Sequence, residues 1–245
     1  MHEYNHTLIL PSLHATLPCA PSQEIICIGG GRPPETDWLT GLIQQRNMCG
    51  SGAPIWAIDR GVDLCHALRL PPVHLIGDGD SASKAAWTWA ETQGAQVHSF
   101  PPKKDFTDTE LTLHIAAERF ARPLIILTAA FGGRLDHLMS TAAVAAHSGI
   151  PCVLADERET LFYLHAGESL TVTCDRAPRA ISLLPFTEEC TGVTTHDLYW
   201  ELRDACITNR ASLAISNVLA RENKKNTFTV SIKSGVLGVY LCCKE

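Results

Sequence analysis

Two aspartates lie two positions apart in the segment Gly77-Asp78-Gly79-Asp80-Ser81. Carboxylates at this spacing repel each other, and both stay ionised most easily when they share a divalent cation such as Mg²⁺. A helix-capping turn with solvated aspartates accounts for the same residues about equally well. The segment therefore indicates either a metal site suited to phosphate chemistry or an ordinary turn, and other segments must decide between them.

Charged residues gather again in segment 103–110, which reads KKDFTDTE. Its T-x-x-E pattern is that of a capping box, and the helix dipole favours an acid such as Asp108 at the same helix start. Helix capping does not explain Lys104 and Asp105, which stand just before it. Because a helix N-terminus also presents free N–H groups to phosphate, the segment favours a phosphate site.

A third segment, 131–137, reads FGGRLDH. Its glycines let the backbone approach a ligand, and Arg134 can hold phosphate oxygens through its planar guanidinium group. Asp136 can cap the helix that follows. His137 is either a ligand or a polar helix residue, and for a single histidine the second reading is the more common.

Two weaker motifs come earlier in the chain. Gly29, Gly30 and Gly31 form a glycine-rich turn, although it lacks the GxGxxG spacing and the P-loop lysine. Asp59 follows an apolar run, as Asp78 does. These motifs are compatible with the nucleotide side of a phosphate site.

All of these segments follow short apolar runs that we expect to be strands, and amphipathic stretches expected to be helices separate them. Strand–helix alternation with continuous apolar strands predicts a parallel sheet covered on both faces. The strand ends then share one edge, where open α/β sheets bind ligands. The expected strands are 25–29, 55–59, 73–77, 96–100, 124–128 and 152–155, and the expected helices 37–48, 81–93, 107–121 and 136–148.

The pattern changes after about residue 158, where segments become short, Thr-rich and alternating. We predict strands at 168–173, 180–184, 198–202, 212–216, 227–233 and 236–242. The fold class is therefore α/β, with an N-terminal parallel-sheet, Rossmann-like domain at 1–158 and a small C-terminal antiparallel β-sandwich domain at 159–245. Residues 1–23 are expected to be an irregular extension or an edge element rather than a signal peptide.

Bulk properties exclude several classes of partner. The 245 residues are 45% hydrophobic and carry a formal net charge of −6, which disfavours nucleic acid and anionic membranes. No apolar run approaches the roughly 20 residues that span a bilayer. The ten cysteines are scattered without a CxxC pair, so we expect reduced thiols in a cytoplasmic protein rather than disulfides or a zinc site.

In this order the motifs resemble the thiamine pyrophosphokinase family, which carries a glycine turn, an ADG-like loop, GDxDS, a KDxTDxE segment and a GxRxDH loop. The segment Ser216-Asn217 is similar to the family's SN element. The chain departs from the family pattern at Gly79, where Phe is usual, at Arg60, where a small residue is common, and at Thr141, which is often Asn.

The resemblance implies an enzyme that moves the diphosphate of ATP to the hydroxyl of thiamine and releases AMP, as a homodimer with thiamine near the interface. It implies Mg²⁺ bound by Asp78, Asp80 and Asp108, with Lys104, Asp105 and Arg134 assisting catalysis. The implied ATP-binding residues are Gly29, Gly30, Gly31, Asp59, Asp80, Ser81, Arg134, Asp136 and His137. The implied thiamine-binding residues are Lys104, Ser216, Asn217 and Trp200.

Alternatives stay open at this point. Trp200 either stacks on the thiamine ring or is a half-buried strand aromatic, which is the commoner role for such a residue. The acceptor could be another alcohol, such as a hydroxymethylpterin. A non-catalytic sensor of the nucleotide or of thiamine diphosphate is a further reading, although it would not need the full charged set.

Overall fold

The computed structural model of the chain describes residues 5–48, 50, 52–99 and 106–244. Its contacts divide the chain into two compact units. One runs from Pro21 to Asp156, and the other combines the residues up to Ala20 with those from Glu157 onward. The second break falls close to the predicted boundary at 158, whereas the N-terminal residues join the unit that contains the C-terminus.

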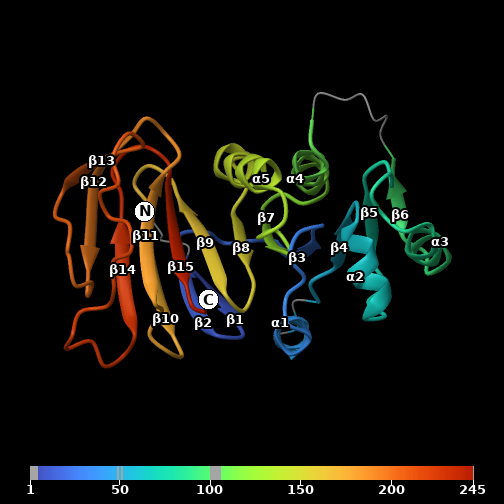
Figure 1. Cartoon of the computed structure of the whole chain (residues 1–245), viewed down its shortest axis with the longest axis horizontal. Helices are drawn as coiled ribbons and strands as arrows, with labels where there is room; N and C mark the ends of the chain where they lie inside the picture. The colour runs from blue at the N-terminus through green and yellow to red at the C-terminus, as the bar shows by residue number, and fades with distance from the viewer. Residues whose placement is uncertain (1–4, 49, 51, 100–105, 245) are drawn as a thin grey trace. The chain divides into compact units, whose positions relative to one another are not determined.

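The α/β unit contains parallel strands in the spatial order β8-β7-β3-β4-β5-β6 (Figure 1). Each strand overlaps a predicted one. The interior strand β7 is buried at all six positions, which explains its unbroken apolar sequence PLIILT. The strands are β3 (Gln23–Ile28), β4 (Ile55–Ile58), β5 (His74–Ile76), β6 (Gln96–His98), β7 (Pro123–Thr128) and β8 (Cys152–Ala155).

The order in which the chain adds strands to this sheet creates one topological switch point, between β3 and β7. From β3 the chain adds β4, β5 and β6 on one side and then returns to place β7 and β8 on the other. Loops that leave β3 and β7 therefore diverge at the carboxyl edge of the sheet. Such a crevice is where open α/β sheets bind ligands.

Side-chain caps mark the starts of two helices of this unit, α3 and α4. Thr107 accepts a bond from the Glu110 N–H at the start of α4, as the capping box predicts, and Ser83 rather than Asp80 or Ser81 caps α3. The short helix α2 was not predicted, since seven residues are too few for a clear amphipathic pattern. The helices are α1 (Thr36–Met48), α2 (Gly61–Ala67), α3 (Lys84–Thr92), α4 (Asp108–Arg119) and α5 (Leu135–His147).

The second unit is antiparallel throughout its named strands, as predicted. One sheet has the order β1-β2-β10-β14-β12-β13, and β11, β15 and β9 pair side by side. The fold class predicted from the sequence is therefore confirmed. The strands are β1 (His6–Leu10), β2 (Leu13–Leu17), β9 (Glu159–Leu164), β10 (Ser169–Cys174), β11 (Ala180–Pro185), β12 (Glu189–His196), β13 (Ala205–Thr208), β14 (Thr227–Ser231) and β15 (Leu237–Cys242).

The N-terminal segment is a hairpin of β1 and β2 at the edge of the six-stranded sheet, so it is not an extension of the α/β unit. Strand β2 pairs with β10, with Thr16 opposite Thr171. Alternate residues such as Leu8, Leu10 and Ala15 are buried, and this burial holds the hairpin on the antiparallel unit.

Two predicted strands are wrong. Segment 198–202 contains only an isolated bridge between Leu198 and Leu219, and segment 212–216 consists of turns. Ala214 and Ser216 have φ values of 68° and 58°, a left-handed conformation that interrupts a strand. No helix in the part of the chain that the structure describes is long and apolar enough to cross a membrane.

Candidate active site

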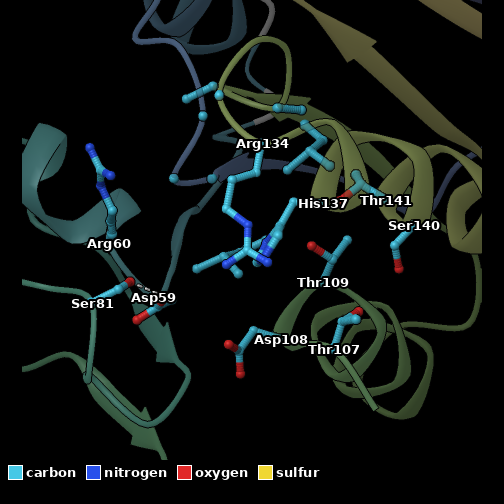
Figure 2. A pocket seen from close by; sticks show the side chains of 18 of the residues that line it. Asp59, Arg60, Ser81, Thr107, Asp108, Thr109, Arg134, His137, Ser140 and Thr141 are labelled. Atoms are coloured by element: carbon cyan, nitrogen blue, oxygen red, sulfur yellow. Dashed lines mark hydrogen bonds between the residues drawn. The ribbon is translucent and has the colours of Figure 1, made fainter.

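A cavity of about 670 Å³ lies at the carboxyl edge of the parallel sheet, over the switch point (Figure 2). Its walls come from the loops after β3, β4 and β7 and from the first turns of α4 and α5. The predicted site residues that line it are Gly29, Gly30, Gly31, Asp59, Ser81, Asp108, Arg134, Asp136 and His137. Arg60 and Thr141, two of the departures from the family pattern, line it as well.

Three carboxylates from neighbouring strand ends converge beside this cavity. One oxygen each of Asp59, Asp78 and Asp80 lies within 4.8 Å of the others. The Asp80 N–H donates to Asp78 Oδ1 at 3.1 Å, and the Ser81 hydroxyl donates to Asp59 Oδ2. Asp59 Oδ1 is buried with no hydrogen-bond partner among the described residues. An unpaired buried carboxylate oxygen is costly unless a cation or donor satisfies it.

The pKa values of this cluster also favour a bound cation. Burial raises the pKa of Asp59, and the charges of Asp108 and Asp78 raise it further, while the hydrogen bond from Ser81 opposes them. The charge of Asp78 raises the pKa of Asp80, with smaller contributions that include Asp59. A divalent cation would remove this repulsion, and an all-carboxylate set suits Mg²⁺.

The cluster differs in one member from the predicted metal ligands. The family resemblance implied Asp108 as a metal ligand and Asp59 as a nucleotide contact, whereas the structure groups Asp59 with Asp78 and Asp80. Asp108 stands in the first turn of α4 and lines the cavity, close enough to raise the pKa of Asp59. Lys104 and Asp105 lie outside the described residues.

The glycine turn after β3 packs directly on the backbone after β7. The Gly31 N–H donates to the Ala129 carbonyl at 2.6 Å. A Cβ added to Gly31 would lie 2.6 Å from the Phe131 carbonyl oxygen, and one added to Gly29 would lie 2.9 Å from that of Ala129. Only glycine permits this close approach, so packing against the loop after β7 explains why the turn contains glycines.

Arg134 and Asp136 form a paired group at the cavity. Arg134 Nε lies 3.1 Å from Asp136 Oδ1, and Nη2 lies 2.6 Å from Oδ2. Arg134 lowers the pKa of Asp136 through this hydrogen-bonded contact. Asp136 does not occupy the capping position of α5, which Arg134 holds, but its Oδ1 accepts the His137 N–H. Both side chains are exposed, so Arg134 is accessible to an anionic ligand.

The predicted thiamine residues of the antiparallel unit lie together. Buried Asn217 donates from Nδ2 to the Trp200 carbonyl at 2.8 Å and accepts the Trp200 N–H at 3.1 Å. Trp200 is 60% exposed and lies outside any strand, so it is not a half-buried strand aromatic. Tyr199 contacts its ring edge-on, and the Ser216 N–H donates to Ser182 Oγ.

Sequence reasoning missed several residues that line the cavity. Thr107 and Thr109 flank Asp108 at the start of α4, and Ser140 lies on α5 one turn beyond Asp136. Their hydroxyl groups can accept or donate hydrogen bonds to a ligand. The helical spacing of Asp136 and Ser140 is the signal that could have identified the latter.

Comparison with known proteins covers both units. The family model described as the catalytic domain of thiamin pyrophosphokinase matches residues 48–154. The model described as its vitamin B1 binding domain matches residues 169–237. The thiamine pyrophosphokinase of Bacillus subtilis is 28% identical over 220 residues, which are 88% of this chain and 96% of that protein.

Solved structures of the same family share the fold. A thiamine pyrophosphokinase from Bacillus subtilis aligns over 91% of this chain and all of its own, with a TM-score of 0.75 and 24% identity. The enzyme from Geobacillus thermodenitrificans aligns over 91% and 99%, with a TM-score of 0.70 and 26% identity. That from Candida albicans aligns over 90% of each chain, with a TM-score of 0.72 and 14% identity. With both domain models matched in order, the chain belongs to the thiamin pyrophosphokinase family.

Proposed function

We propose that this chain transfers the diphosphate of ATP to the hydroxyl group of thiamine, giving thiamine diphosphate and AMP. Family membership supports thiamine diphosphokinase activity, and neither the pterin kinase nor the non-catalytic sensor is favoured. The observation that carries the proposal is the convergence of three carboxylates, a glycine turn and Arg134 on one edge of the parallel sheet. This combination suits a polyphosphate with a divalent cation.

The residues present fit a bound Mg²⁺, because Asp59 Oδ1 lacks a partner among the described residues and two more carboxylates converge on it. Asp59, Asp78 and Asp80 would hold the ion, and Asp108 lines the same cavity. When bound, Mg²⁺ supplies charge neutralisation for the polyphosphate. The aspartates themselves fix the position of that charge at the strand ends.

The remaining cavity residues would bind and orient ATP. The glycine turn would let the nucleotide approach the backbone, and residues in the first turns of α4 and α5 line the cavity, where a helix start favours phosphate. Arg134 would bind oxygens of the transferred diphosphate after leaving Asp136. In the reaction the thiamine hydroxyl oxygen forms a bond to the β-phosphorus, and the bond from that phosphorus to the α,β-bridging oxygen breaks. AMP leaves with the bridging oxygen.

Thiamine would bind against Trp200, with Asn217 and Ser216 shaping the backbone around it. Asn217 bonds to both the N–H and the carbonyl of Trp200, so it fixes the main chain that carries the exposed indole ring. Lys104 and Asp105 would act at the acceptor hydroxyl, with Asp105 orienting Lys104 or accepting the proton. Most catalysis would then come from positioning and charge stabilisation.

The direct test incubates the purified chain with Mg²⁺, ATP and thiamine and separates the products by chromatography. Thiamine diphosphate and AMP should appear in equal amounts. A hydroxymethylpterin offered in place of thiamine should give no AMP above background. AMP formation with the pterin alone, or tight ATP binding without turnover, would contradict the proposal.

A homodimer with the acceptor site near its interface is part of the proposal. Asp80→Asn removes a metal ligand and Trp200→Ala an acceptor contact, so each variant should be poorly active alone when thiamine is held below KM. If Trp200 serves the partner's ATP site, mixing the two variants should restore part of the activity. Light scattering should give twice the mass of the chain. A monomer that is fully active would refute the shared site. The cytoplasmic location stays a proposal, which cell fractionation can test.

A further inference from the structure

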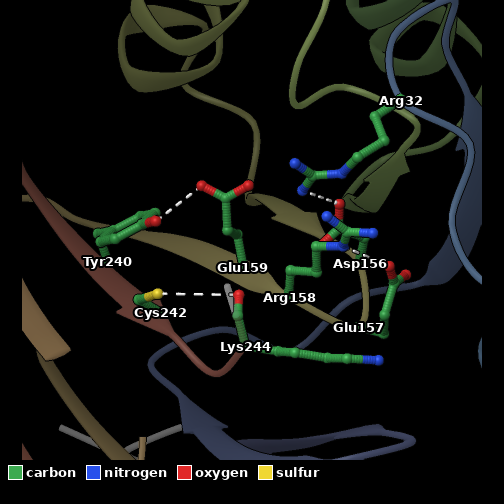
Figure 3. Close-up of polar contacts among 8 residues, drawn as sticks. All are labelled: Arg32, Asp156, Glu157, Arg158, Glu159, Tyr240, Cys242 and Lys244. Atoms are coloured by element: carbon green, nitrogen blue, oxygen red, sulfur yellow. Dashed lines mark hydrogen bonds and ion pairs between the residues drawn. The ribbon is translucent and has the colours of Figure 1, made fainter. Parts of the chain in front are cut away.

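Arg32 stands directly after the glycine turn and bonds to the end of another strand. Its Nη2 lies 2.6 Å from Oδ2 of Asp156, the residue that follows β8 (Figure 3). The Asp156 side chain has no exposed surface, while that of Arg32 is 27% exposed. Neither residue lines the cavity, and neither belongs to one of the motifs found in the sequence.

The main chain of Arg32 also bonds to the loop after β7, which forms another wall of the cavity. Its N–H donates to the Phe131 carbonyl at 2.6 Å, next to the bond from Gly31 to Ala129. A Cβ added to Gly132 would lie 3.0 Å from the Arg32 Cβ, so the two loops are packed to contact at this point. Arg32 thus joins the glycine turn to the loop that carries Arg134.

A buried carboxylate such as that of Asp156 is not expected where the fold needs only packing. An apolar pair of similar volume is often as stable or more stable than a buried ion pair, because both charges lose their hydration. A charged pair with a short hydrogen bond nevertheless fixes direction and distance, which an apolar contact does not. This property matters most where backbone groups must face a ligand.

We propose that Arg32 is a positioning residue for nucleotide binding: its bond to Asp156 anchors its side chain at the end of β8, while its main chain holds the glycine turn against the loop after β7. The inference rests on the proposed function only in naming ATP as the nucleotide. Arg32 acts through the backbone of Gly29–Gly31 and the loop 129–134. It does not itself need to touch the substrate.

The chain offers a matched control for this pair. Arg46 of α1 is 3% exposed, and its Nε lies 3.0 Å from Oε2 of Glu24, near the start of β3. This is also a buried Arg–carboxylate pair in the α/β unit, but it lies at the opposite end of β3 from the glycine turn. Arg32→Met and Arg46→Met therefore remove the same chemistry at two distances from the cavity.

Binding of a non-hydrolysable ATP analogue with Mg²⁺ is measured by calorimetry without thiamine, at a temperature where circular dichroism shows each variant folded. Arg32→Met should raise Kd by roughly 10-fold, since small misplacements at a binding site are costly, and Arg46→Met by less than about 2-fold. Arg32→Lys, which keeps the charge, should recover part of the loss. In turnover, Arg32→Met should raise KM for ATP and leave KM for thiamine unchanged.

The double variant Arg32→Met/Asp156→Leu separates positioning from stability. Removing both charges should return the melting temperature toward that of the parent chain, while Kd for the analogue stays raised. Amide exchange at Gly31 and at position 32 should be faster in Arg32→Met and unchanged in Arg46→Met, and this arm needs no nucleotide. Parental Kd in the double variant, or unchanged exchange in Arg32→Met, would overturn the inference. If Arg32→Met shows the expected changes in Kd and amide exchange but the parent chain does not turn over thiamine, the proposed function is wrong and the inference stands.

Discussion

Ser81 donates a hydrogen bond to Asp59 Oδ2 and so ties the loop after β5 to the end of β4 (Figure 2). Asp59 adopts a left-handed backbone conformation, with φ of 47°, which an ordinary L-residue occupies only at a cost. One oxygen of Asp59 is thus satisfied by Ser81, and the other, buried Oδ1 has no hydrogen-bond partner among the described residues. The strained residue and the acidic loop form one unit.

The first prediction separates the two candidates for the third metal ligand. If Asp59 binds Mg²⁺ directly, Asp59→Asn should raise the Mg²⁺ concentration for half-maximal activity by roughly 10-fold or more, and Asp108→Asn by less. The measurement is a Mg²⁺ titration of initial rate at saturating ATP after chelator treatment. A larger effect of Asp108→Asn would favour the ligand set predicted from the sequence.

The second prediction concerns the acidic loop itself. Asp80→Asn should lower kcat by roughly 100-fold, because a lost carboxylate weakens charge stabilisation in the transition state. Asp80 is exposed, so the melting temperature should change little. Glu91→Gln, an exposed acid on α3 outside the cavity, should keep the parental rate. If Asp80→Asn retains a near-normal rate, its assignment as a metal ligand is wrong.

The third prediction tests how Arg134 binds phosphate. Arg134→Lys keeps the charge but loses the planar pair of donors, so kcat/KM for ATP should fall by roughly 10-fold. Asp136→Asn releases Arg134 from its partner and should change kcat/KM far less. Steady-state rates at varied ATP measure both. An Arg134→Lys variant with parental kcat/KM would show that a point charge suffices.

The sequence predicted the α/β unit well because its signals are local. Continuous apolar runs such as PLIILT mark buried parallel strands, and a threonine three positions before a glutamate marks the start of α4. The strand ends then bring Asp59, Asp78 and Asp80 to one edge by topology alone. Motif order could not reveal that Asp59 rather than Asp108 completes the cluster, because this depends on the left-handed turn at Asp59.

The antiparallel unit was predicted less well because its pairings are distant in sequence. Strand β2 pairs with β10, more than 150 positions away, and nothing in residues 1–23 alone indicates that partner. The Arg32–Asp156 bond also joins distant residues, which no spacing rule connects. Segment 212–216 alternates like a strand, but the positive φ values of Ala214 and Ser216 bend it.

The fourth prediction concerns the exposed indole of Trp200. Trp200→Ala should raise KM for thiamine by roughly 10-fold, since stacking on a cationic ring is lost, and leave KM for ATP within about 2-fold. Leu213→Ala is a suitable control, because Leu213 is also exposed, at 54%. Equal changes in both variants would mean that Trp200 makes no specific contact with the acceptor.

The last prediction follows from a histidine pair at the edge of the parallel sheet. His74 Nδ1 lies 3.0 Å from His98 Nε2, and the buried His74 ring packs edge-on against Trp56. Burial lowers the pKa of His74 to about 4, and the charges of Arg119 and His98 contribute in the same direction. Burial also lowers the pKa of His98. The folded chain therefore resists protonation that the unfolded chain accepts.

The sign of the effect follows from this difference. Between pH of about 6.5 and about 4 the unfolded state binds more protons, so stability is fully present above that window and is lost as pH falls through it, by up to about 3 kcal/mol. His74→Gln cannot titrate, so its free energy of unfolding should depend less on pH. Urea titrations at several pH values measure this, with His14→Gln, an exposed strand residue, as control. Equal pH dependence in His74→Gln and the parent chain would contradict this account.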